Sequence, residues 1–309
     1  MYLEILKKYK IKPKKSLGQN FLINEEILSK ISSFLDIKWK KIIEIWPWYW
    51  TLTEKLLKNN PKELILIEID KNMVNILEKR IKNWDFYTKW IDIKIINEDV
   101  LKYKENTPPS QSFSQSPLPN PPSKPSPQPS PKGRGSRTER VEQKGDNQEY
   151  FVIANIPYNI TSPILRHFMY KIDNTPNCMI ILMQKDVWDK ILWYKKNKSS
   201  FLSLFINKKY NVEKILDVSK NDFFPVPKVD SSVLFFKKHN LYSDIDDDKF
   251  FKILKMWFFF KRKKLLTNFI NWWIEKYKIL NIFKKLNIDE NIRWDSLDID
   301  IWCRIVKEF

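Results

Sequence analysis

The chain has 309 residues, which is enough for two domains or for one large domain with an appendage. Lysine and arginine outnumber aspartate and glutamate by 55 to 37, and the net charge of +18 favours a polyanionic partner, nucleic acid before membrane. The two distant cysteines, the lack of an export signal and the lack of an apolar run near ~20 residues argue for a cytoplasmic protein without disulfides, metal or membrane span.

Apolar periodicity predicts a helix over 25–35, followed by the alternating strands and helices that are typical of a doubly wound sheet. The expected strands are 41–45, 63–70, 91–100, 151–156 and 178–183, and the expected helices are 51–59, 71–82, 164–170 and 185–194. From residue 244 onward the pattern is helical and basic, with helices expected at 248–260, 265–277 and 299–307. We therefore predict an α/β fold: a Rossmann-like doubly wound sheet over 1–240 and a small helical C-terminal domain over 245–309.

A segment of unusual composition, about 105–149, separates the third and fourth expected strands. Ten of the 25 residues from 107 to 131 are proline, and most of the others are Ser, Gln or Asn. Such a composition cannot bury a core, so we expect the insert to be disordered and dispensable.

Three tryptophans crowd the turn after the first expected strand, where the residues from Glu44 to Thr53 read EIWPWYWTLT. A ligand-binding turn between a strand and a helix needs glycine, because its backbone adopts unusual φ/ψ values and approaches the ligand closely. With glycine at positions 46, 48 and 50 the segment reads EIGPGYGTLT, which resembles the first motif of S-adenosylmethionine-dependent methyltransferases. We interpret Trp46, Trp48 and Trp50 as glycine positions.

The glycine and tryptophan contents support this interpretation. The chain has 13 Trp and 4 Gly, and three of the four glycines lie in the insert, which leaves only Gly18. An average usage of about 7% predicts roughly twenty glycines. Some bacterial lineages read UGA as glycine, and translating such a gene with UGA as tryptophan replaces part of its glycine by tryptophan. Trp39 and Trp294 also occupy expected turns, whereas a Trp-rich core or an RNA-stacking surface is the alternative explanation.

Six further motifs follow one another along the chain: KKSLGQNFL (14–22), IEID (67–70), EDV (98–100), NIPYN (155–159), MQKDV (183–187) and FFPVPKVDS (223–231). With the turn at 44–53 they closely resemble the small-subunit rRNA adenine N6-dimethyltransferase family, over nearly the whole chain apart from the insert. The first and fourth motifs are highly specific, and IEID alone is weak. The resemblance implies a monomeric enzyme that uses S-adenosylmethionine to methylate N6 of two adjacent adenines of small-subunit rRNA in the immature small ribosomal subunit.

The motifs contain side chains suited to this chemistry on physical grounds. The ligand of a doubly wound sheet lies at the C-terminal ends of its strands. Glu68 ends the second expected strand, where an acidic residue accepts hydrogen bonds from ribose hydroxyls, and Asp99 ends the third, where it can accept from an adenine amino group. Asn155 follows an apolar strand, and a ligand amine would satisfy its side chain if it is buried.

Methyl transfer to an amine needs little acid–base catalysis. Acceptors on the Asn155 side chain and near the carbonyl groups of Ile156 and Pro157 can hold the amine N–H groups, and Tyr158 offers an aromatic face to an unstacked base. The resemblance agrees, since Asn155 and Tyr158 match the target-adenine motif and Phe224 matches an aromatic residue that cages the base. The positions that match cofactor-binding residues are Asn20, Leu22, Trp46, Trp48, Glu68, Asp99 and Asn155.

Several alternatives remain open at this point. Tyr158 and Phe224 can instead be core aromatics, and the basic clusters at 12–15 and 261–264 can be charged helix faces instead of phosphate contacts. His167 and His239 suggest no catalytic pair. The chain can also be a large-subunit rRNA methyltransferase of the macrolide-resistance type. If the tryptophans are genuine, it is a non-catalytic RNA-binding assembly factor.

Overall fold

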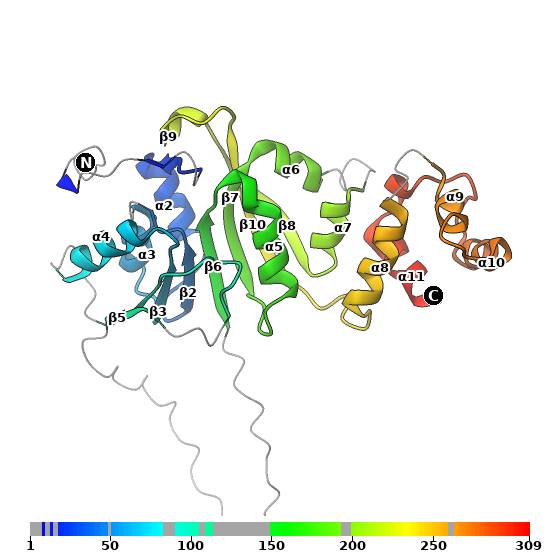
Figure 1. Ribbon diagram of the computed structural model, residues 1–309, viewed down its shortest axis with the longest axis horizontal. Helices are drawn as coiled ribbons and strands as arrows, with labels where there is room; N and C mark the ends of the chain where they lie inside the picture. The colour runs from blue at the N-terminus through cyan, green and yellow to red at the C-terminus, as the bar shows by residue number, and fades with distance from the viewer. Residues whose placement is uncertain are drawn as a thin grey trace, which may run out of the picture.

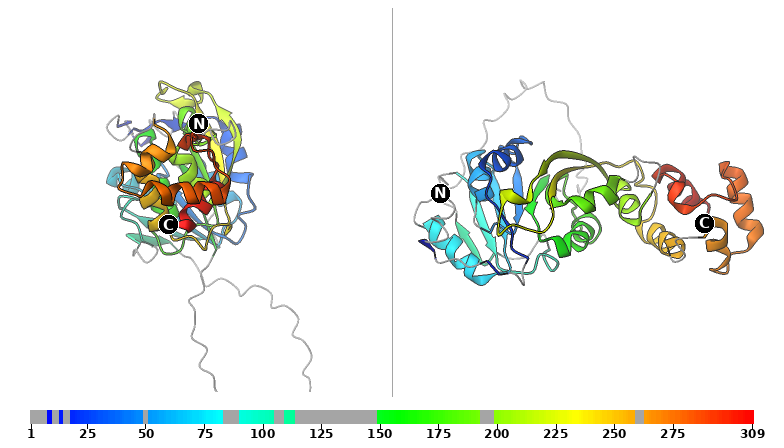
Figure 2. Two further views of the ribbon diagram at one scale, coloured as in Figure 1. Left: turned by 90° about the vertical axis from the view of Figure 1, so that its right-hand side faces the viewer. Right: turned by 90° about the horizontal axis from the view of Figure 1, so that it is seen from above.

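The computed structural model describes residues 8–9, 13–14, 18–48, 51–82, 90–104, 109–113, 149–192, 199–258 and 263–309. Trp50, nearly all of the insert and much of the two basic clusters lie outside these ranges. Helices flank a central sheet, and a group of helices at the C-terminal end of the chain extends away from the sheet (Figures 1 and 2).

Eight strands of the described residues form the central sheet, in the order β5-β4-β3-β2-β6-β7-β10-β8. The five inner strands from β4 to β7 are parallel, and β5, β10 and β8 are antiparallel to their neighbours. The bounds are β2 Lys41–Ile45, β3 Glu63–Ile67, β4 Asp92–Ile96, β5 Gln111–Phe113, β6 Tyr150–Asn155, β7 Cys178–Gln184, β8 Tyr210–Val218 and β10 Ser231–Lys238.

The chain changes direction across the sheet at β2. It adds β3 and β4 on one side of β2 and then returns to place β6 and β7 on the other side. In sheets of this kind, the ligand site lies at such a switch point, outside the carboxyl ends of the strands. The confirmed Rossmann-like fold therefore directs attention to the residues that follow β2, β3, β4 and β6.

Amphipathic helices connect the strands and bury their apolar faces against the sheet. Asn24 caps the first of them, because its side-chain oxygen accepts hydrogen bonds from the backbone N–H groups of Glu26 and Ile27. The bounds are α2 Glu25–Ser33, α3 Thr51–Lys58, α4 Lys71–Lys82, α5 Thr161–Tyr170, α6 Lys185–Leu192 and α7 Phe201–Asn207.

A second, two-stranded sheet joins two distant motifs of the sequence. Strand β1 (Phe21–Leu22) pairs antiparallel with β9 (Phe223–Phe224), so that Phe21 lies opposite Phe224. Asn24 also donates a hydrogen bond to the Asp222 carboxylate at 2.8 Å. These contacts attach the segment around Phe224 to the N-terminal motif.

The C-terminal helices enclose a second buried cluster, which includes Phe250, Leu265, Phe283 and Trp302 and to which Leu204 of α7 also belongs. The helices are α8 Asp247–Phe258, α9 Leu265–Ile270, α10 Lys276–Leu286 and α11 Ile299–Glu308. None of the described helices is long and apolar enough to cross a membrane.

The structure corrects three expectations about the elements. The helix expected at 265–277 is wrong, since α9 and α10 are separate and the chain turns at Trp273, whose φ is +63°. The antiparallel strands β8 and β10 were not anticipated beside the five expected strands. Within the insert, residues 111–113 are not disordered but form the edge strand β5, which pairs with β4.

Candidate active site

The predicted cofactor residues come together at the carboxyl ends of the inner strands. Trp46 directly follows β2, Glu68 directly follows β3, and Asn155 is the last residue of β6. Asp99 lies three residues beyond the end of β4. Four separate segments thus converge at the switch point between β2 and β6, as the strand-end argument predicts.

Two small cavities lie at this edge, with Trp46 and Trp48 in the walls of both. One has a volume of about 200 Å³, and its wall includes Glu68, Asp99 and Pro157. The other has a volume of about 20 Å³, and its wall includes Leu22 and Asn155. Ligand sites for small molecules and cofactors typically have ~300–1,000 Å³, so the two cavities together are smaller than a typical cofactor site.

The two indoles occupy the space between the cavities. Their ring centroids are 6.4 Å apart and the planes are stacked at 21°, and the ring of Phe21 meets Trp48 edge-on at 5.3 Å. Trp46 is 8% exposed and its φ is +54°, in the left-handed region that L-residues with a side chain rarely adopt. The indoles therefore narrow the site, and the backbone at Trp46 has the conformation of a glycine turn.

Two buried carboxyl groups lie at the same edge. Burial raises the pKa of Glu68 to about 8, although its Oε1 accepts a hydrogen bond from the Asp70 N–H at 2.8 Å. Its other oxygen, Oε2, is buried and has no hydrogen-bond partner among the described residues. Burial also raises the pKa of Glu44 to about 8, and Thr53 Oγ1 donates to its Oε2 at 2.7 Å.

An unpartnered buried oxygen needs an explanation, and a ligand donor is one. The position of Glu68 at the end of β3 is the position that binds ribose hydroxyls in folds of this type. Gln19 Nε2 is a second buried polar atom without a partner in the described part of the chain, and Gln19 lines the same cavity as Glu68. The polar groups of the site thus fit a nucleoside-containing cofactor, whereas the two indoles do not.

The N-terminal motif closes one side of the site. Gly18 has φ +62°, and a Cβ at this position would lie 3.2 Å from the Cβ of Pro157. The side chain of Lys14 pairs with Asp70 at 2.7 Å, and its backbone N–H donates to Gln19 Oε1 at 2.7 Å. Gly18 therefore permits a close approach between the first motif and the NIPYN motif.

The two aromatic residues predicted to hold the target base lie outside the cavity walls. Tyr158 begins η2 (Tyr158–Ile160), a 3-10 helix of one turn, and its hydroxyl lies 2.8 Å from Ser231 Oγ. Phe224 is 37% exposed on β9. Asn20 also lies outside the walls, where its side-chain amide donates to the Gly18 carbonyl at 3.3 Å.

Sequence reasoning missed Gln19, Glu44 and Asn159 as lining residues. All three lie within the sequence motifs described above (14–22, 44–53 and 155–159), and this position could have identified them as candidate lining residues. His167 is structural in its contacts, since its Nε2 lies 2.8 Å from the Tyr103 carbonyl oxygen and burial lowers its pKa.

The switch-point site and the topology define a Rossmann-like α/β enzyme of the methyltransferase class. Residues 10–309 match the ribosomal RNA adenine dimethylase family, and the chain belongs to this family. The membership confirms the predicted enzyme class, an rRNA adenine dimethyltransferase.

Relatives of nearly full length support the assignment. The chain is 32% identical over 303 residues to the ribosomal RNA small subunit methyltransferase A of Pelagibacter ubique, with 97% of both chains covered. It is 31% identical over 294 residues to the protein of the same name from Mycoplasma mobile, with 94% of this chain and 95% of the relative covered.

Solved structures show the same fold. A dimethyladenosine transferase from Plasmodium falciparum aligns with a TM-score of 0.68 at 22% identity, covering 94% of this chain and 97% of the other. The 23S rRNA methyltransferase ErmE aligns with a TM-score of 0.62 at 15% identity, covering 93% and 98%.

Proposed function

We propose that the chain transfers methyl groups from S-adenosylmethionine to N6 of two adjacent adenines in small-subunit rRNA during ribosome maturation, acting as a monomer in the cytoplasm. The observation that carries the proposal is the position of Asn155, Pro157 and Tyr158 at the carboxyl edge of β6, beside the buried acid Glu68. The small-subunit names of the relatives favour this reaction over the large-subunit one.

The cofactor, when bound, supplies a methyl group on a sulfonium centre, and the chain's residues position its partner. The Asn155 side chain, part of the cavity wall, accepts an N–H of the target amine. The ring of Tyr158 stacks on the target adenine, and Phe224 covers the base from β9. When the cofactor is bound, Glu68 would accept hydrogen bonds from its ribose hydroxyls and Asp99 would accept one from its adenine amino group. Asn20 and Leu22 would contact it from the N-terminal motif.

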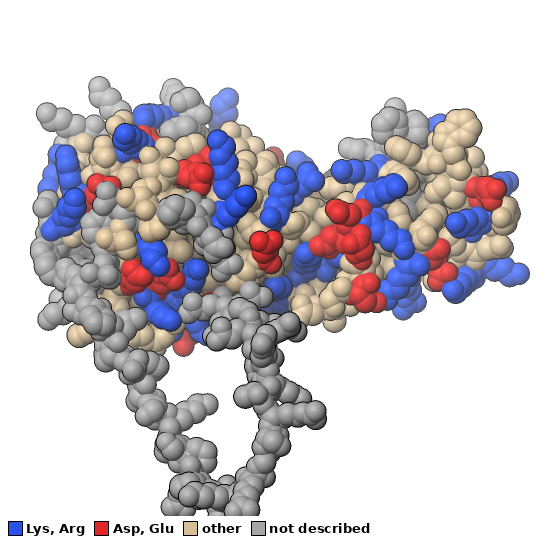
Figure 3. All heavy atoms as spheres, turned by 60° about the horizontal axis from the view of Figure 1, so that its bottom comes forward, with Lys and Arg blue, Asp and Glu red and all other residues tan. Residues whose placement is uncertain are grey.

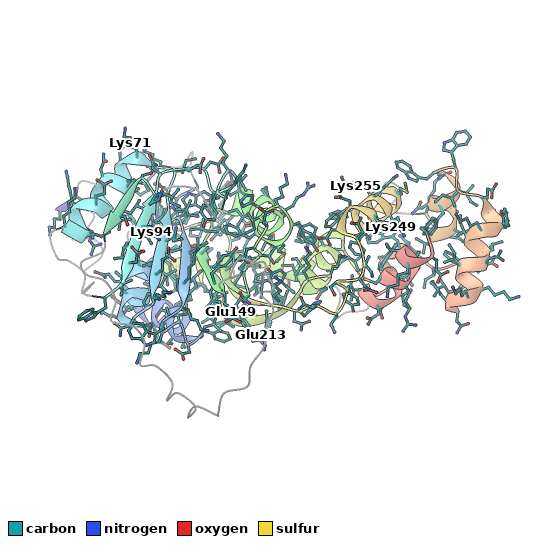
Figure 4. All side chains as sticks on the ribbon, turned by 90° about the horizontal axis from the view of Figure 1, so that it is seen from below. Lys71, Lys94, Glu149, Glu213, Lys249 and Lys255 are labelled. Atoms are coloured by element: carbon teal, nitrogen blue, oxygen red, sulfur yellow. The ribbon has the colours of Figure 1, made fainter. Side chains whose placement is uncertain are left out.

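The distribution of charge fits an extended polyanion. Lysine and arginine side chains are spread over the sheet and over the C-terminal helices (Figure 3). Lys249 and Lys255 lie on α8, whereas Lys71 lies at the start of α4 toward the other end of the molecule (Figure 4). Basic groups along the whole length support rRNA binding through phosphates, which positions the RNA without reading its bases.

The test uses the full chain with Trp46→Gly, Trp48→Gly and Trp50→Gly, the triple-glycine chain, and small ribosomal subunits that lack adenine dimethylation. Mass spectrometry of the rRNA should find two adjacent dimethylated adenines. Asn155→Ala should lower turnover by about 100-fold, the scale on which a single transition-state hydrogen bond acts. The rRNA affinity should stay nearly unchanged, because it depends mainly on phosphate contacts.

Two results would contradict the proposal. Methylation of large-subunit rRNA in place of small-subunit rRNA would assign the chain to the alternative reaction. Equal losses of RNA affinity and turnover in Asn155→Ala and Tyr158→Ala would indicate an RNA-binding surface, as in a non-catalytic assembly factor.

We further propose that glycine is the natural residue at positions 46, 48 and 50, and that the same holds at 39 and 273. Among the described residues, five residues other than glycine have a positive φ. Three of them are Trp39, Trp46 and Trp273, and the other two are Asn60 and Asn287. Asparagine tolerates this conformation, whereas it costs other L-residues ~1–2 kcal/mol. At Trp273 no packing of the side chain offsets this cost, because the residue is 96% exposed.

The local hydrogen bonds at two of these positions support glycine. The Lys40 N–H donates to the Ile37 carbonyl at 3.1 Å, which makes Trp39 the third residue of a four-residue turn that needs a positive φ. The Ile274 N–H donates to Phe269 O at 3.4 Å, and the Trp273 N–H donates to Ile270 O at 3.0 Å. This is the Schellman motif, whose left-handed residue is usually glycine.

Trp48 is also buried and its φ is not positive, so the proposal of glycine there rests on its place in the walls of both cavities. Trp294 lines neither cavity. It is buried in the C-terminal cluster and its φ is not positive, so the structure gives no support to a glycine there. Peptide sequencing of natively expressed protein across 37–53, 271–276 and 291–297 tests the proposal. Glycine at the proposed positions and tryptophan at 294 is the expected result, and tryptophan at 46 and 273 would contradict it.

A further inference from the structure

The turn that carries Tyr158 has little support from its own backbone. Its N-cap residue is Pro157, which contributes no side-chain cap, and the Ile160 N–H reaches the Pro157 carbonyl at 3.3 Å. A single turn of 3-10 helix fixes several backbone dihedrals with few hydrogen bonds and is weak in isolation. The orientation of the Tyr158 ring must therefore depend on a contact outside the turn.

The hydroxyl of Ser231 provides that contact. Tyr158 Oη and Ser231 Oγ are 2.8 Å apart, and Ser231 is fully buried. Ser231 is the first residue of β10, where its backbone lies between Gln184 of β7 and Val218 of β8. Pairing on both sides makes this a rigid part of the sheet, so the phenol is attached to a fixed point.

The same chain segment carries both predicted aromatic walls of the target-base site. Phe224 lies on β9, which is paired with β1, and only seven positions separate it from Ser231. Pro225 and Pro227 lie between them and restrict the backbone of the connection. Phe224 and the anchor of Tyr158 are thus set by one short, restricted segment.

We propose that Ser231 is a positioning residue whose hydroxyl holds the Tyr158 ring in the orientation that stacks on the target adenine. The proposal rests on the proposed function, because it takes Tyr158 as the residue that contacts the base. Ser231 contacts the phenol oxygen of Tyr158 and is not part of the wall of either cavity of the site. Losing its hydroxyl releases the ring without removing the aromatic face.

Ser232 provides a matched control. It is also fully buried, and its side chain lies on the opposite face of the strand, where the hydroxyl donates to Asp217 at 2.7 Å. Ser231→Ala and Ser232→Ala each remove one buried hydroxyl from adjacent residues. Only the first removes the contact with Tyr158.

The test is a double-mutant cycle of Ser231→Ala and Tyr158→Phe in the triple-glycine chain. Each single change should lower kcat about 3- to 10-fold, the size expected for one hydrogen bond, with KM for the ribosomal particle within about twofold. Ser231→Ala should add nothing in the Tyr158→Phe background, because the contact is already lost. Ser232→Ala should leave kcat within about twofold of the parent.

A second measurement does not depend on activity. Hydrogen exchange of the amides of 158–161 should be faster in Ser231→Ala than in Ser232→Ala, both in the chain as written and in the triple-glycine chain. Additive losses of kcat in the cycle, or equal exchange in the two serine variants, would overturn the role of Ser231. Full turnover in Tyr158→Ala would instead overturn the proposed role of Tyr158. This result distinguishes a failure of the proposed function from a failure of the proposal for Ser231.

Discussion

A residue with positive φ occurs at the ends of helices α9 and α10 and also at the ligand edge of the sheet, but the residue type differs between these places. Helix α10 ends in a Schellman motif with Asn287 at φ +55°, and α9 ends in the same motif with Trp273 at φ +63°. At the sheet edge, Trp46 has φ +54°. Trp302, in contrast, lies inside helix α11 and is fully buried. Backbone conformation therefore separates two groups of tryptophan that composition cannot separate.

Burial alone would sort these residues differently. Trp46 and Trp302 are both buried, whereas Trp273 is almost fully exposed. A side chain in a helix core contributes through its packing, but a side chain at a positive φ adds strain wherever it lies. At the sheet edge the strain coincides with buried atoms of Glu68 and Gln19 that have no hydrogen-bond partner among the described residues, a combination found at ligand sites, where it lowers stability.

The largest expected effect is on cofactor binding at the sheet edge. The triple-glycine chain should bind S-adenosylmethionine in isothermal calorimetry, and the chain as written should not. The indoles of Trp46 and Trp48 line both cavities, and a filled ligand pocket cannot relax without excluding the ligand. Trp273→Gly alone, far from the site, should not restore binding. Equal affinity in the written and triple-glycine chains would contradict the glycine assignment.

The next largest effect is expected in the C-terminal cluster. Trp302→Ala should lower the free energy of unfolding by about 3–5 kcal/mol, since it empties a fully buried position of its aromatic side chain. Urea titration followed by circular dichroism measures the change. A loss below ~1 kcal/mol would show that the packing of Trp302 contributes little to the cluster, contrary to its burial.

The buried carboxyl groups at the sheet edge give a pH dependence. The pKa of Glu68 is about 8 in the folded protein and near 4.5 when exposed, so the folded state holds the extra proton between these values. The contribution of Glu68 to stability is therefore fully present below pH 4.5 and is lost as pH rises toward 8, by at most about 1.4 kcal/mol per pH unit for each such group. Urea titrations at pH 5, 6.5 and 8 should show a smaller fall in Glu68→Gln.

An exposed acid supplies the control for this measurement. Glu26 on α2 pairs with Lys30 at 2.6 Å, and its pKa is lowered by the hydrogen bond to that lysine. Glu26→Gln should leave the slope between pH 5 and 8 unchanged. An unchanged slope in Glu68→Gln would show that Glu68 is not the group that titrates.

A smaller effect is expected at the two Schellman motifs. Trp273→Gly should stabilise the protein by about 1 kcal/mol, because it removes the cost of a left-handed L-residue and loses almost no buried surface. Asn287→Gly should change stability by only a few tenths of a kcal/mol, since asparagine already tolerates this conformation. Thermal unfolding of both variants measures the difference, and a destabilising Trp273→Gly would contradict the proposal.

The ends of the inner strands could be predicted from the sequence, whereas the long-range contacts could not. Strand β2 has the predicted bounds because its apolar run is bordered by turns, and Glu68 and Asn155 follow from where apolar runs stop. The break between α9 and α10 was missed because the left-handed residue at the end of α9 is Trp273, so the sequence lacks the glycine that usually signals such an end. The contact between Tyr158 and Ser231 joins residues 73 positions apart, and no local pattern encodes such a pair.

The antiparallel strands show a second limit. Strand β8 carries Glu213, Lys214 and Asp217 and is partly exposed along most of its length, so it lacks the continuous apolar run of the inner strands. Its pairing depends on β10, which itself lies between β8 and β7. A strand defined by its neighbours is not readable from its own residues.

The smallest effect is expected from the insert. Strand β5 runs antiparallel to β4, so Phe113 ends at the edge of the sheet where β6 begins, opposite to the edge that carries Asn155. A linker of about ten residues can span the four strand spacings between β5 and β6, roughly 19 Å. Replacing 114–148 by such a linker should shift the free energy of unfolding by less than ~1 kcal/mol, because loop length alone costs little.

Removing β5 as well makes the comparison sharper. A deletion of 106–148 takes away the strand that pairs with Ile93 and Ile95 of β4 and leaves that sheet edge uncovered. We expect this longer deletion to lower the melting temperature and promote association, while the shorter one does neither and keeps S-adenosylmethionine binding in the triple-glycine chain. Loss of cofactor binding in the shorter deletion would show that the segment after Phe113 is structural, and equal behaviour of the two deletions would show that β5 contributes nothing to the sheet.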